Sequence, residues 1–537
     1  MNDKQIALPY RGKGDKRQVE TRPMYVEEWL DSLPYIDFHN TCNALYAALQ
    51  GTNKVPMKSN QRMELIRLYN RPYEYYLNSQ ISSGAQHTLQ SIETMQTQLE
   101  DMKRLAIALA HASRKTIDDV ASHKSLWGQT KPPLQSMLQA INYLSHALIF
   151  SYLEYSPPAK NVWFQLHYMY KFAETLKQEK TPYDLSGSKS KGNTTTAERL
   201  YRRILLVSLA DPYHLPFGAV WEIYEQVNQW ADKTALREFA RVTDPTGVFV
   251  INKDKDSGPI PYEKFDTSKA GKSHHIIDTN GLLPVVEKHI QSTSSGKEDP
   301  DLTFSSYYAK SLLTIIYKAW SLPPKRYAPR QTSSGKLGIS HGLNATYYFI
   351  NNNEDFVEKP TGPQENDEDV VVGEDNIPLD NPVRQYDLES WNLLDKSSGG
   401  LAILKNRRPG TGIRVGDLIG FSPKGSSNAE HGWVVGVLRW LLVKPDSAYR
   451  AGVQALSKKM LPGAIRVPAG NTLERTWTRA LLSEHPAKNR EILVITNRGL
   501  YGKGRRIELE YNGTVYTGTI TSLNESTVGF ERFGIQC

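Results

Sequence analysis

The feature that most constrains the fold is a change in hydrophobic period near residue 243. Before it, apolar residues recur at steps of three and four, and after it short β-branched and aromatic runs alternate with Gly, Asn, Ser and Pro. Steps of three and four place apolar side chains on one face of a helix, whereas short punctuated runs are typical of strands. The pattern predicts a multidomain α+β protein with a helical part followed by a β-rich part.

The helical pattern follows a polar and basic tail over residues 1–24 and defines a helical domain over residues 25–243. An apolar stripe occurs in one long segment and is repeated after the Pro132-Pro133 break. Such stripes usually form the core between helices, so they predict a scaffold and no binding site. The first stripe consists of Leu89, Ile92, Met95, Leu99, Met102, Leu105 and Leu109.

A mixed α/β connecting segment is expected over residues 244–322. Gly247–Ile251 and His275–Thr279 have the composition of strands, and Phe304–Trp320 has the pattern of a helix. This helix leads directly into Pro323-Pro324-Lys325, which breaks it. We therefore expect the helix to respond to any movement of the residues that follow.

Two short motifs lie in the β-rich part. Arg326-Tyr-Ala-Pro-Arg330 has the form RxxxR, and Asp395-Lys-Ser397-Ser-Gly399-Gly400 has the form DxSxxG. Guanidinium groups fork onto phosphates and stack on purine faces, and a carboxylate accepts the N–H donors of a guanine edge. An RxxxR match alone is weak, because about one is expected by chance in a chain of this length. The interpretation of the two motifs as a nucleotide site therefore depends on their order and on the strands predicted around them.

The strand candidates around the two motifs predict a small antiparallel barrel. They are short runs rich in β-branched and aromatic residues, separated by residues that favour turns. The runs are Leu343–Ile350, Leu401–Leu404, Asp417–Phe421, Gly432–Val443 and Tyr449–Ala455.

With these motifs in this order, the segment from about residue 323 to 456 resembles the PilZ domain, the bacterial receptor module for cyclic di-GMP. The strand Tyr449-Arg-Ala-Gly-Val also looks like the last barrel strand of that family. The resemblance places a PilZ-like antiparallel β-barrel at residues 323–460 and implies that cyclic di-GMP is its ligand.

The resemblance also implies roles for the motif residues. Arg326 and Arg330 are expected to contact phosphate and stack on guanine, and Lys325 to add charge beside them. Asp395 is expected to accept from a guanine edge, with Ser397 adding a hydroxyl bond. Gly400 is expected to permit close backbone approach, where a side chain would collide.

An acidic insertion over residues 352–382 departs from the family pattern. It contains few large apolar groups, so it is expected to be disordered or dependent on a partner for its structure. It lengthens the spacing between the arginines and Asp395. If it connects adjacent strands, the site still assembles, because the entropy of loop closure grows slowly with length.

A second small β-rich domain is expected over residues 465–537, with Asn512-Gly513 as a tight hairpin turn. Arg475–Arg479 and Asn524–Gly529 satisfy the same two motif forms. The second of these is expected to lie at the last strand of the chain, with no barrel strand following it. We therefore predict a companion barrel without a nucleotide site.

Composition agrees with a cytoplasmic protein, and the resemblance implies a bacterial one. Cys42 and Cys537 are the two cysteines, which predicts no disulfide framework, and the N-terminus lacks the apolar core of a signal peptide. No apolar run is long enough to span a bilayer. The net charge of +8, from 65 basic and 57 acidic residues, suits an anionic ligand but is too mild and diffuse to indicate nucleic acid.

Enzyme motifs are absent from the sequence, so we expect a binding protein without a cofactor or metal. It contains no Walker loop, HExxH helix or paired CxxC. The adjacent pair His274-His275 is interpreted as a surface pair, because no third ligand is spaced to complete a metal site.

The leading hypothesis is a cytosolic effector that binds cyclic di-GMP without chemistry and changes its contacts with an unidentified protein partner. One alternative is a nucleic-acid-binding adaptor that uses two small basic barrels. Another is a ligand-free PilZ-like scaffold that binds only proteins. In the nucleic-acid alternative the stacking and phosphate-binding side chains would be Trp433, Trp440, Trp477, Tyr501 and Arg505-Arg506.

Overall fold

The computed structural model describes residues 6–11, 18–81, 92–122, 133–185, 194–294, 299–304, 309–321, 331–357, 386–407, 412–422, 432–444, 446, 448–457, 459–468, 477–486 and 491–537. The chain divides into two compact units, residues 1–325 and residues 326–537. The first unit is mainly helical and the second is built from strands, which confirms the predicted α+β class.

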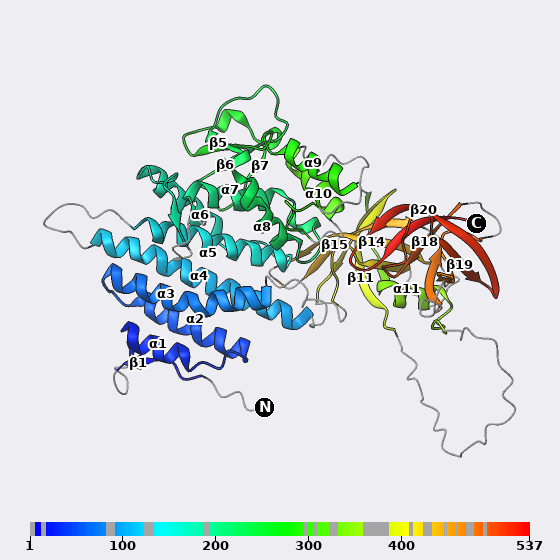
Figure 1. The fold of residues 1–537 in the computed structure, drawn as a ribbon, viewed down its shortest axis with the longest axis horizontal. Helices are drawn as coiled ribbons and strands as arrows, with labels where there is room; N and C mark the ends of the chain where they lie inside the picture. Colours follow the sequence, from blue (N-terminus) through cyan, green and yellow to red (C-terminus); the bar gives the residue numbers. More distant parts are fainter. Residues whose placement is uncertain are drawn as a thin grey trace, which may run out of the picture. The chain divides into compact units, whose positions relative to one another are not determined.

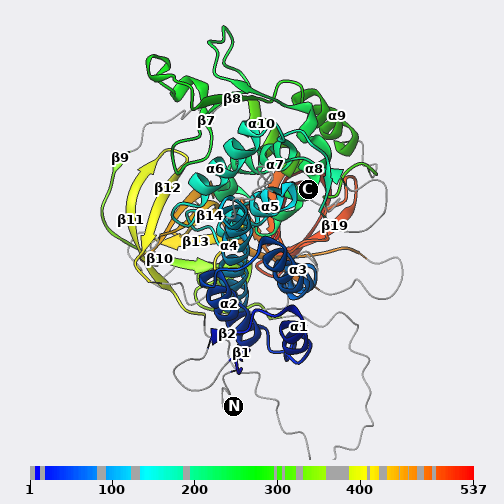
Figure 2. The same ribbon diagram turned by 90° about the vertical axis from the view of Figure 1, so that its left-hand side faces the viewer.

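Helices α4 and α5 form the long central pair of the first unit, and α2, α3, α6, α7 and α8 pack around them (Figure 1). Figure 2 shows α2, α3 and α4 nearly end-on. Almost the whole of α5 is buried, because apolar residues occupy most of its circumference. The helices are α1 (Pro23–Asp31), α2 (Phe38–Lys54), α3 (Ser59–Tyr76), α4 (Ile92–Ser122), α5 (Leu134–Leu153), α6 (Val162–Thr175), α7 (Ala197–Leu209) and α8 (Ala219–Trp230). Among the helices of the described part, none combines the length and apolar character needed to cross a membrane.

A small sheet and two helices follow within the first unit. The strand order is β5-β8-β6-β7, and both strands predicted here are confirmed as β6 and β8. The elements are β5 (Ala235–Glu238), β6 (Val248–Asn252), β7 (Ile260–Pro261), β8 (His274–Asp278), α9 (Leu283–Ser294) and α10 (Ala309–Ser321). Two small pairs are β1 (Tyr10–Arg11) with β2 (Gln18–Val19), and β3 (Tyr183–Asp184) with β4 (Thr194–Thr195).

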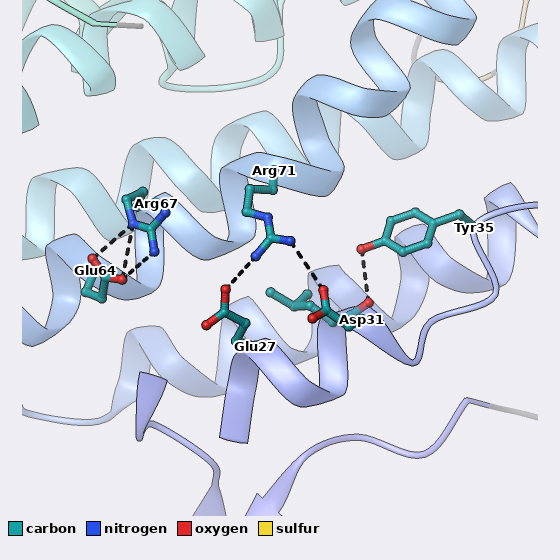
Figure 3. A network of polar contacts seen from close by, with 7 residues as sticks. Glu27, Asp31, Tyr35, Glu64, Arg67 and Arg71 are labelled. Carbon is teal, nitrogen blue, oxygen red and sulfur yellow. Dashed lines mark hydrogen bonds and ion pairs between the residues drawn. The ribbon is translucent and has the colours of Figure 1, made fainter. Parts of the chain in front are cut away.

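Polar contacts attach α1 to α3 at the surface of the first unit. The Arg71 guanidinium contacts Glu27 at 2.7 Å and Asp31 at 3.3 Å, as Figure 3 shows. About half of the Arg71 side chain is exposed. Water screens such a pair, so it positions α1 without contributing much stability.

A second arginine on α3 is buried. Arg62 Nε lies 2.5 Å from Asp119 Oδ2 of α4, and the Arg62 side chain is 2% exposed. The same guanidinium donates to the carbonyl oxygens of Thr52 and Val55 at the end of α2. It therefore joins three helices through one buried cation.

The two arginines should differ in their effect on stability. Arg62→Ala should lower the free energy of unfolding by about 3 kcal/mol, because it removes the buried cation that contacts Asp119 and the carbonyl oxygens of Thr52 and Val55. Arg71→Ala, the exposed control on the same helix, should cost about 1 kcal/mol or less. Urea unfolding followed by far-UV circular dichroism measures both. Equal losses would contradict the assignment of Arg62 as the joint between the helices.

The first part of the second unit is an antiparallel barrel, as predicted (Figure 1). The sheet order is β10-β13-β14-β15-β12-β11-β9, and an additional pairing of β10 with β11 closes the ring. The strands are β9 (Gln331–Thr332), β10 (Lys336–His341), β11 (Glu389–Ser397), β12 (Gly400–Lys405), β13 (Leu418–Ser422), β14 (Val434–Val443) and β15 (Tyr449–Ser457).

The prediction of a strand over Leu343–Ile350 is wrong, because these residues lie in helix α11 (Gly342–Ile350). Gly342 has φ +80°, which turns the chain out of β10. Leu343, Tyr347 and Ile350 then lie one helical turn apart and join one buried cluster. A short apolar run does not separate helix from strand by period, and here tertiary packing selects the helix.

A second closed barrel completes the chain. Its strands are β16 (Leu461–Arg466), β17 (Thr478–Leu482), β18 (Glu491–Thr496), β19 (Arg506–Tyr511), β20 (Thr514–Ser526) and β21 (Glu531–Gln536), in the ring order β16-β17-β18-β21-β20-β19. The predicted hairpin turn is confirmed, with φ of 50° at Asn512 and 79° at Gly513.

The two barrels have the same topology. The strands of each barrel can be numbered one to six along the chain, with β9 and β10 counted as one interrupted strand. Around the ring, the order in both barrels is then first, fourth, fifth, sixth, third and second. The cluster containing α11 also includes Val435 and Val437 of the first barrel and Leu481 and Phe530 of the second. Helix α11 therefore contributes to the hydrophobic contact between the two barrels.

Candidate functional site

The DxSxxG motif forms a tight hairpin in the first barrel. Asp395 and Ser397 lie at the end of β11, and Gly400 begins β12. Ser397 pairs with Gly400 across the turn, and the Ser397 hydroxyl donates to the Gly400 carbonyl oxygen at 3.3 Å. The motif thus places a carboxylate and a hydroxyl two residues apart on one strand end.

The RxxxR motif leads into a strand that pairs with this hairpin. Lys325, Arg326 and Arg330 lie outside the described residues. The next two residues form β9, where Gln331 pairs with Lys396 and Thr332 pairs with Asp395. Neighbouring strands lie about 4.8 Å apart, so the chain leaving Arg330 is anchored one strand spacing from the motif carboxylate.

The residues that connect β9 to β10 make two backbone hydrogen bonds with β11, and these keep the pairing of β9 with β11 in register. The Ser333 amide donates to the Leu394 carbonyl oxygen at 3.2 Å, and the Leu393 amide donates to the Gly335 oxygen at 2.9 Å. The partner strand β11 shifts register between Leu393 and Asp395, which is the geometry of a β-bulge. Bulges redirect side chains next to functional sites, and this one lies at the motif carboxylate.

Most of the acidic insertion predicted over residues 352–382 lies outside the described residues, from 358 onward. It connects α11 to β11, and β11 pairs directly with β10, with Lys336 opposite Asn392. The insertion therefore lies between two adjacent strands of the ring. Its length does not prevent β9, which follows the arginines in the sequence, from pairing with β11.

Gly400 has a structural requirement of its own. A Cβ built at Gly400 would lie 2.3 Å from the Val453 carbonyl oxygen of β15, closer than any real contact. A Cβ built at the neighbouring Gly399 would meet nothing within 4 Å. The barrel itself therefore excludes a side chain at the first position and tolerates one at the second.

Alanine substitution at Gly399 and at Gly400 should have different effects on the stability of the first barrel. Gly400→Ala should destabilise the first barrel by about 1–3 kcal/mol, because β12 and β15 must move apart to accept the methyl group. Gly399→Ala, the adjacent control, should change the unfolding free energy by about 0.5 kcal/mol or less. Thermal unfolding of the full chain measures the difference, and similar midpoints for both variants would contradict this account.

A partly buried ion pair lies elsewhere in the first barrel. His341 Nε2 at the end of β10 lies 2.6 Å from Asp417 Oδ2, and the Arg414 amide donates to the same oxygen at 2.6 Å. Burial lowers the pKa of His341, but the hydrogen bond and charge of Asp417, together with the charge of Glu389, outweigh it despite the opposing charge of Arg414. The net result is a raised pKa, so the imidazolium form is favoured in the folded barrel.

This pair should make the stability of the barrel depend on pH. Because the folded pKa is raised above the unfolded value of about 6.5, the stabilisation is fully present below that value and is lost as pH rises through the folded pKa. His341→Gln should remove the dependence. Calorimetry of the full chain, at pH values from below to above neutrality, measures how its stability depends on pH. An unchanged pH profile in the variant would exclude His341 as the cause.

The similar motifs of the second barrel occupy different topological positions. Arg479 lies within β17, the second strand, and Asn524–Gly529 spans the end of β20, the fifth. The expectation that no strand follows the latter is wrong, because β21 does. The equivalent of the first-barrel hairpin is the β17–β18 connection, where Ser483-Glu484-His485 replaces the motif. The two motif pairs are therefore not equivalent by topology.

Sequence reasoning missed the short strand that joins the chain after the RxxxR motif to the DxSxxG strand. Gln331 and Thr332 are exposed and belong to no motif, but they form the pairing of β9 with β11. A polar dipeptide after the second arginine gives no strand signal at sequence level. In the described residues, no cluster of three or more His, Cys, Asp or Glu side chains is arranged to hold a metal ion.

Comparison with known proteins gives two adjoining family matches. Residues 25–241 match the model described as "Cyclic-di-GMP receptor FimW, N-terminal domain", and residues 248–382 match "Cyclic-di-GMP receptor FimW, middle PilZ domain". The second match includes the RxxxR segment and ends before Asp395. Together the matches cover more than half of the chain, and no curated protein matches it.

Proposed function

Because this chain belongs to the cyclic-di-GMP receptor FimW family, we propose that its first barrel binds cyclic di-GMP and passes its occupancy to a protein partner in the bacterial cytoplasm. The family is one of receptors, so the chain is a binding protein rather than an enzyme. The proposed ligand residues are Lys325, Arg326, Arg330, Asp395, Ser397 and Gly400.

One observation carries the proposal. The pairing of Thr332 with Asp395 joins the chain that follows Arg330 to the strand that carries the motif carboxylate, although a long insertion separates them in the sequence. Cyclic di-GMP contains both phosphate and guanine, and the two motifs contain side chains that can bind each of them. Arg326 and Arg330 supply forked cationic donors to phosphate, and Asp395 accepts the N–H donors of a guanine edge.

The hydroxyl and the glycine have supporting roles in the proposal. Ser397 lies two residues beyond Asp395 on the same strand, so its hydroxyl reaches the same ligand edge. Gly400 keeps β12 against β15 and leaves the backbone of the hairpin open to the ligand. We assign the binding barrel to residues 323–460 and the companion barrel to residues 465–537.

Coupling to a partner follows from charge and chain continuity. The arginine segment follows Pro323-Pro324 and precedes β9, and α10 ends at Ser321. Ligand phosphates neutralise the segment and favour one position of it against the barrel. A ligand shifts a conformational equilibrium only through different affinities for the two states. Positioning this segment is therefore the free-energy link to a partner surface.

Replacement of the arginines tests the proposed site. Arg326→Ala or Arg330→Ala should weaken cyclic di-GMP binding by about 2 kcal/mol or more, because a charge-assisted contact is lost. Isothermal titration of the full chain measures the dissociation constant.

Arg475→Ala is the matched control, since Arg475 occupies the same motif form in the second barrel. Arg479 is less suitable, because its guanidinium lies 3.7 Å from Asp355 and over the Phe356 ring at 5.6 Å. If the control abolishes binding and the Arg326 and Arg330 variants do not, the site has been assigned to the wrong barrel.

A further inference from the structure

A cavity of about 540 Å³ lies among helices α5, α7 and α8 of the first unit, which pack against one another. Small-molecule sites are typically about 300–1,000 Å³ in volume, so this cavity has a suitable size. Helix α3 ends beside it in a π-helical turn over Leu77–Ile81, and Leu77 and Asn78 of this turn line the cavity. Such turns are rare and often occur at functional sites. The cavity is therefore a candidate ligand site in the helical part of the chain.

Arg203 of α7 lines this cavity as a buried cation without a counter-ion. The residue is 9% exposed, and it makes no ion pair with any residue that the structure describes. Its Nη2 donates to the Tyr224 carbonyl oxygen at 3.1 Å, and its guanidinium carbon lies 4.0 Å from the centroid of the Tyr224 ring. Its Nη1 makes no hydrogen bond with a described residue. A buried cation without an anion is costly, so an anionic group of a ligand would be favoured here.

The same cavity has a carboxylate that is not paired with this arginine. Glu225 of α8 lines the cavity and is exposed, and it makes no hydrogen bond or ion pair with any described residue. Glu222 lines the cavity three residues earlier on the helix. Burial and the charge of Arg203 lower the pKa of His146 to about 3, so His146 is neutral at neutral pH. Among the described residues that line the cavity, Arg203 is thus the one cation, and it faces two carboxylates.

Aromatic rings form another part of the cavity wall. The ring centroid of His146 lies 5.7 Å from that of Trp221 and 5.7 Å from that of Tyr224. The Tyr73 hydroxyl lies 2.9 Å from His146 Nδ1 and holds the imidazole in place. The indole N–H of Trp221 makes no hydrogen bond with a described residue. Aromatic rings favour centroid separations of about 4.5–7 Å, so a ring of a ligand could join this group.

We propose that this cavity binds an aromatic α-amino acid. The ligand carboxylate accepts from Arg203, its ammonium group donates to Glu225, and its ring packs against Trp221. A free amino acid carries one charge of each sign close together, which matches two opposite charges that line one cavity without pairing. The second carboxylate, Glu222, disfavours a dianion such as a phosphate monoester, because like charges repel. The helical part is then a ligand-binding domain that is separate from the barrel site.

Three matched probes test which groups of the ligand are recognised. Isothermal titration of the full chain compares L-phenylalanine with 2-phenylethylamine, which lacks the carboxylate, and with 3-phenylpropionate, which lacks the ammonium group. L-phenylalanine should bind at least about tenfold more tightly than either analogue, because each analogue loses one charge-assisted contact. L-alanine, which lacks the ring, should also bind at least about tenfold more weakly.

Two variants assign the charged contacts. Arg203→Gln should remove the preference for L-phenylalanine over 2-phenylethylamine, and Glu225→Gln should remove the preference over 3-phenylpropionate. Arg202→Gln is the matched control on α7, because Arg202 is paired with Glu198 and does not line the cavity. It should leave all four affinities unchanged. Cyclic di-GMP affinity should be the same in all three variants, because none of these residues lies in the proposed barrel site.

The inference is overturned if L-phenylalanine does not bind, or if it binds no more tightly than both charge-deleted analogues. It is also overturned if the preferences persist in both cavity variants. In each case unaltered binding of cyclic di-GMP leaves the proposed function standing. Thermal unfolding shows whether each variant folds. Should Arg203→Gln not fold, Glu225→Gln at its exposed position and the four probes on the unaltered chain decide the question.

Discussion

Pairing of β11 on one edge with both β9 and β10 is the constraint on which the rest of the first barrel depends. The β10 pairing closes the ring, and the β9 pairing brings the residue after Arg330 next to Lys396. A shift of one residue would turn Asp395 to the inner face. The bulge between Leu393 and Asp395 fixes the register at this point. Closure of the ring and attachment of the chain that follows the arginines therefore both depend on pairings of the same strand, β11.

Much of this architecture could be predicted from hydrophobic period. Long apolar stripes such as Leu99 to Leu109 gave reliable helices, and the Asn512-Gly513 turn gave a reliable hairpin. The run from Leu343 could not be assigned, because its helix is selected by contacts with β13 and with the second barrel. The pairing of Thr332 was equally hidden, since nothing in a two-residue polar strand indicates its partner.

Because the two barrels share one topology, the positions of their similar motifs can be compared strand by strand, and these positions differ. In the first barrel the arginines precede the first strand, and the carboxylate motif joins the second to the third. In the second barrel the matching letters fall on the second and fifth strands. Arg439 joins the two barrels, donating to Gln454 at 2.6 Å and to Glu525 at 2.5 Å. Because Gln454 pairs with Gly400, this contact connects the proposed ligand face to the companion barrel.

The central claim is that cyclic di-GMP is held between the arginine segment and the β11–β12 hairpin. Hydrogen exchange of the full chain with and without saturating ligand tests it most directly. The account expects protection to increase over residues 326–332 and 393–401, while residues 477–486 of the second barrel remain unchanged. Saturating ligand that leaves both first-barrel segments unchanged, or protects the second barrel instead, would contradict it.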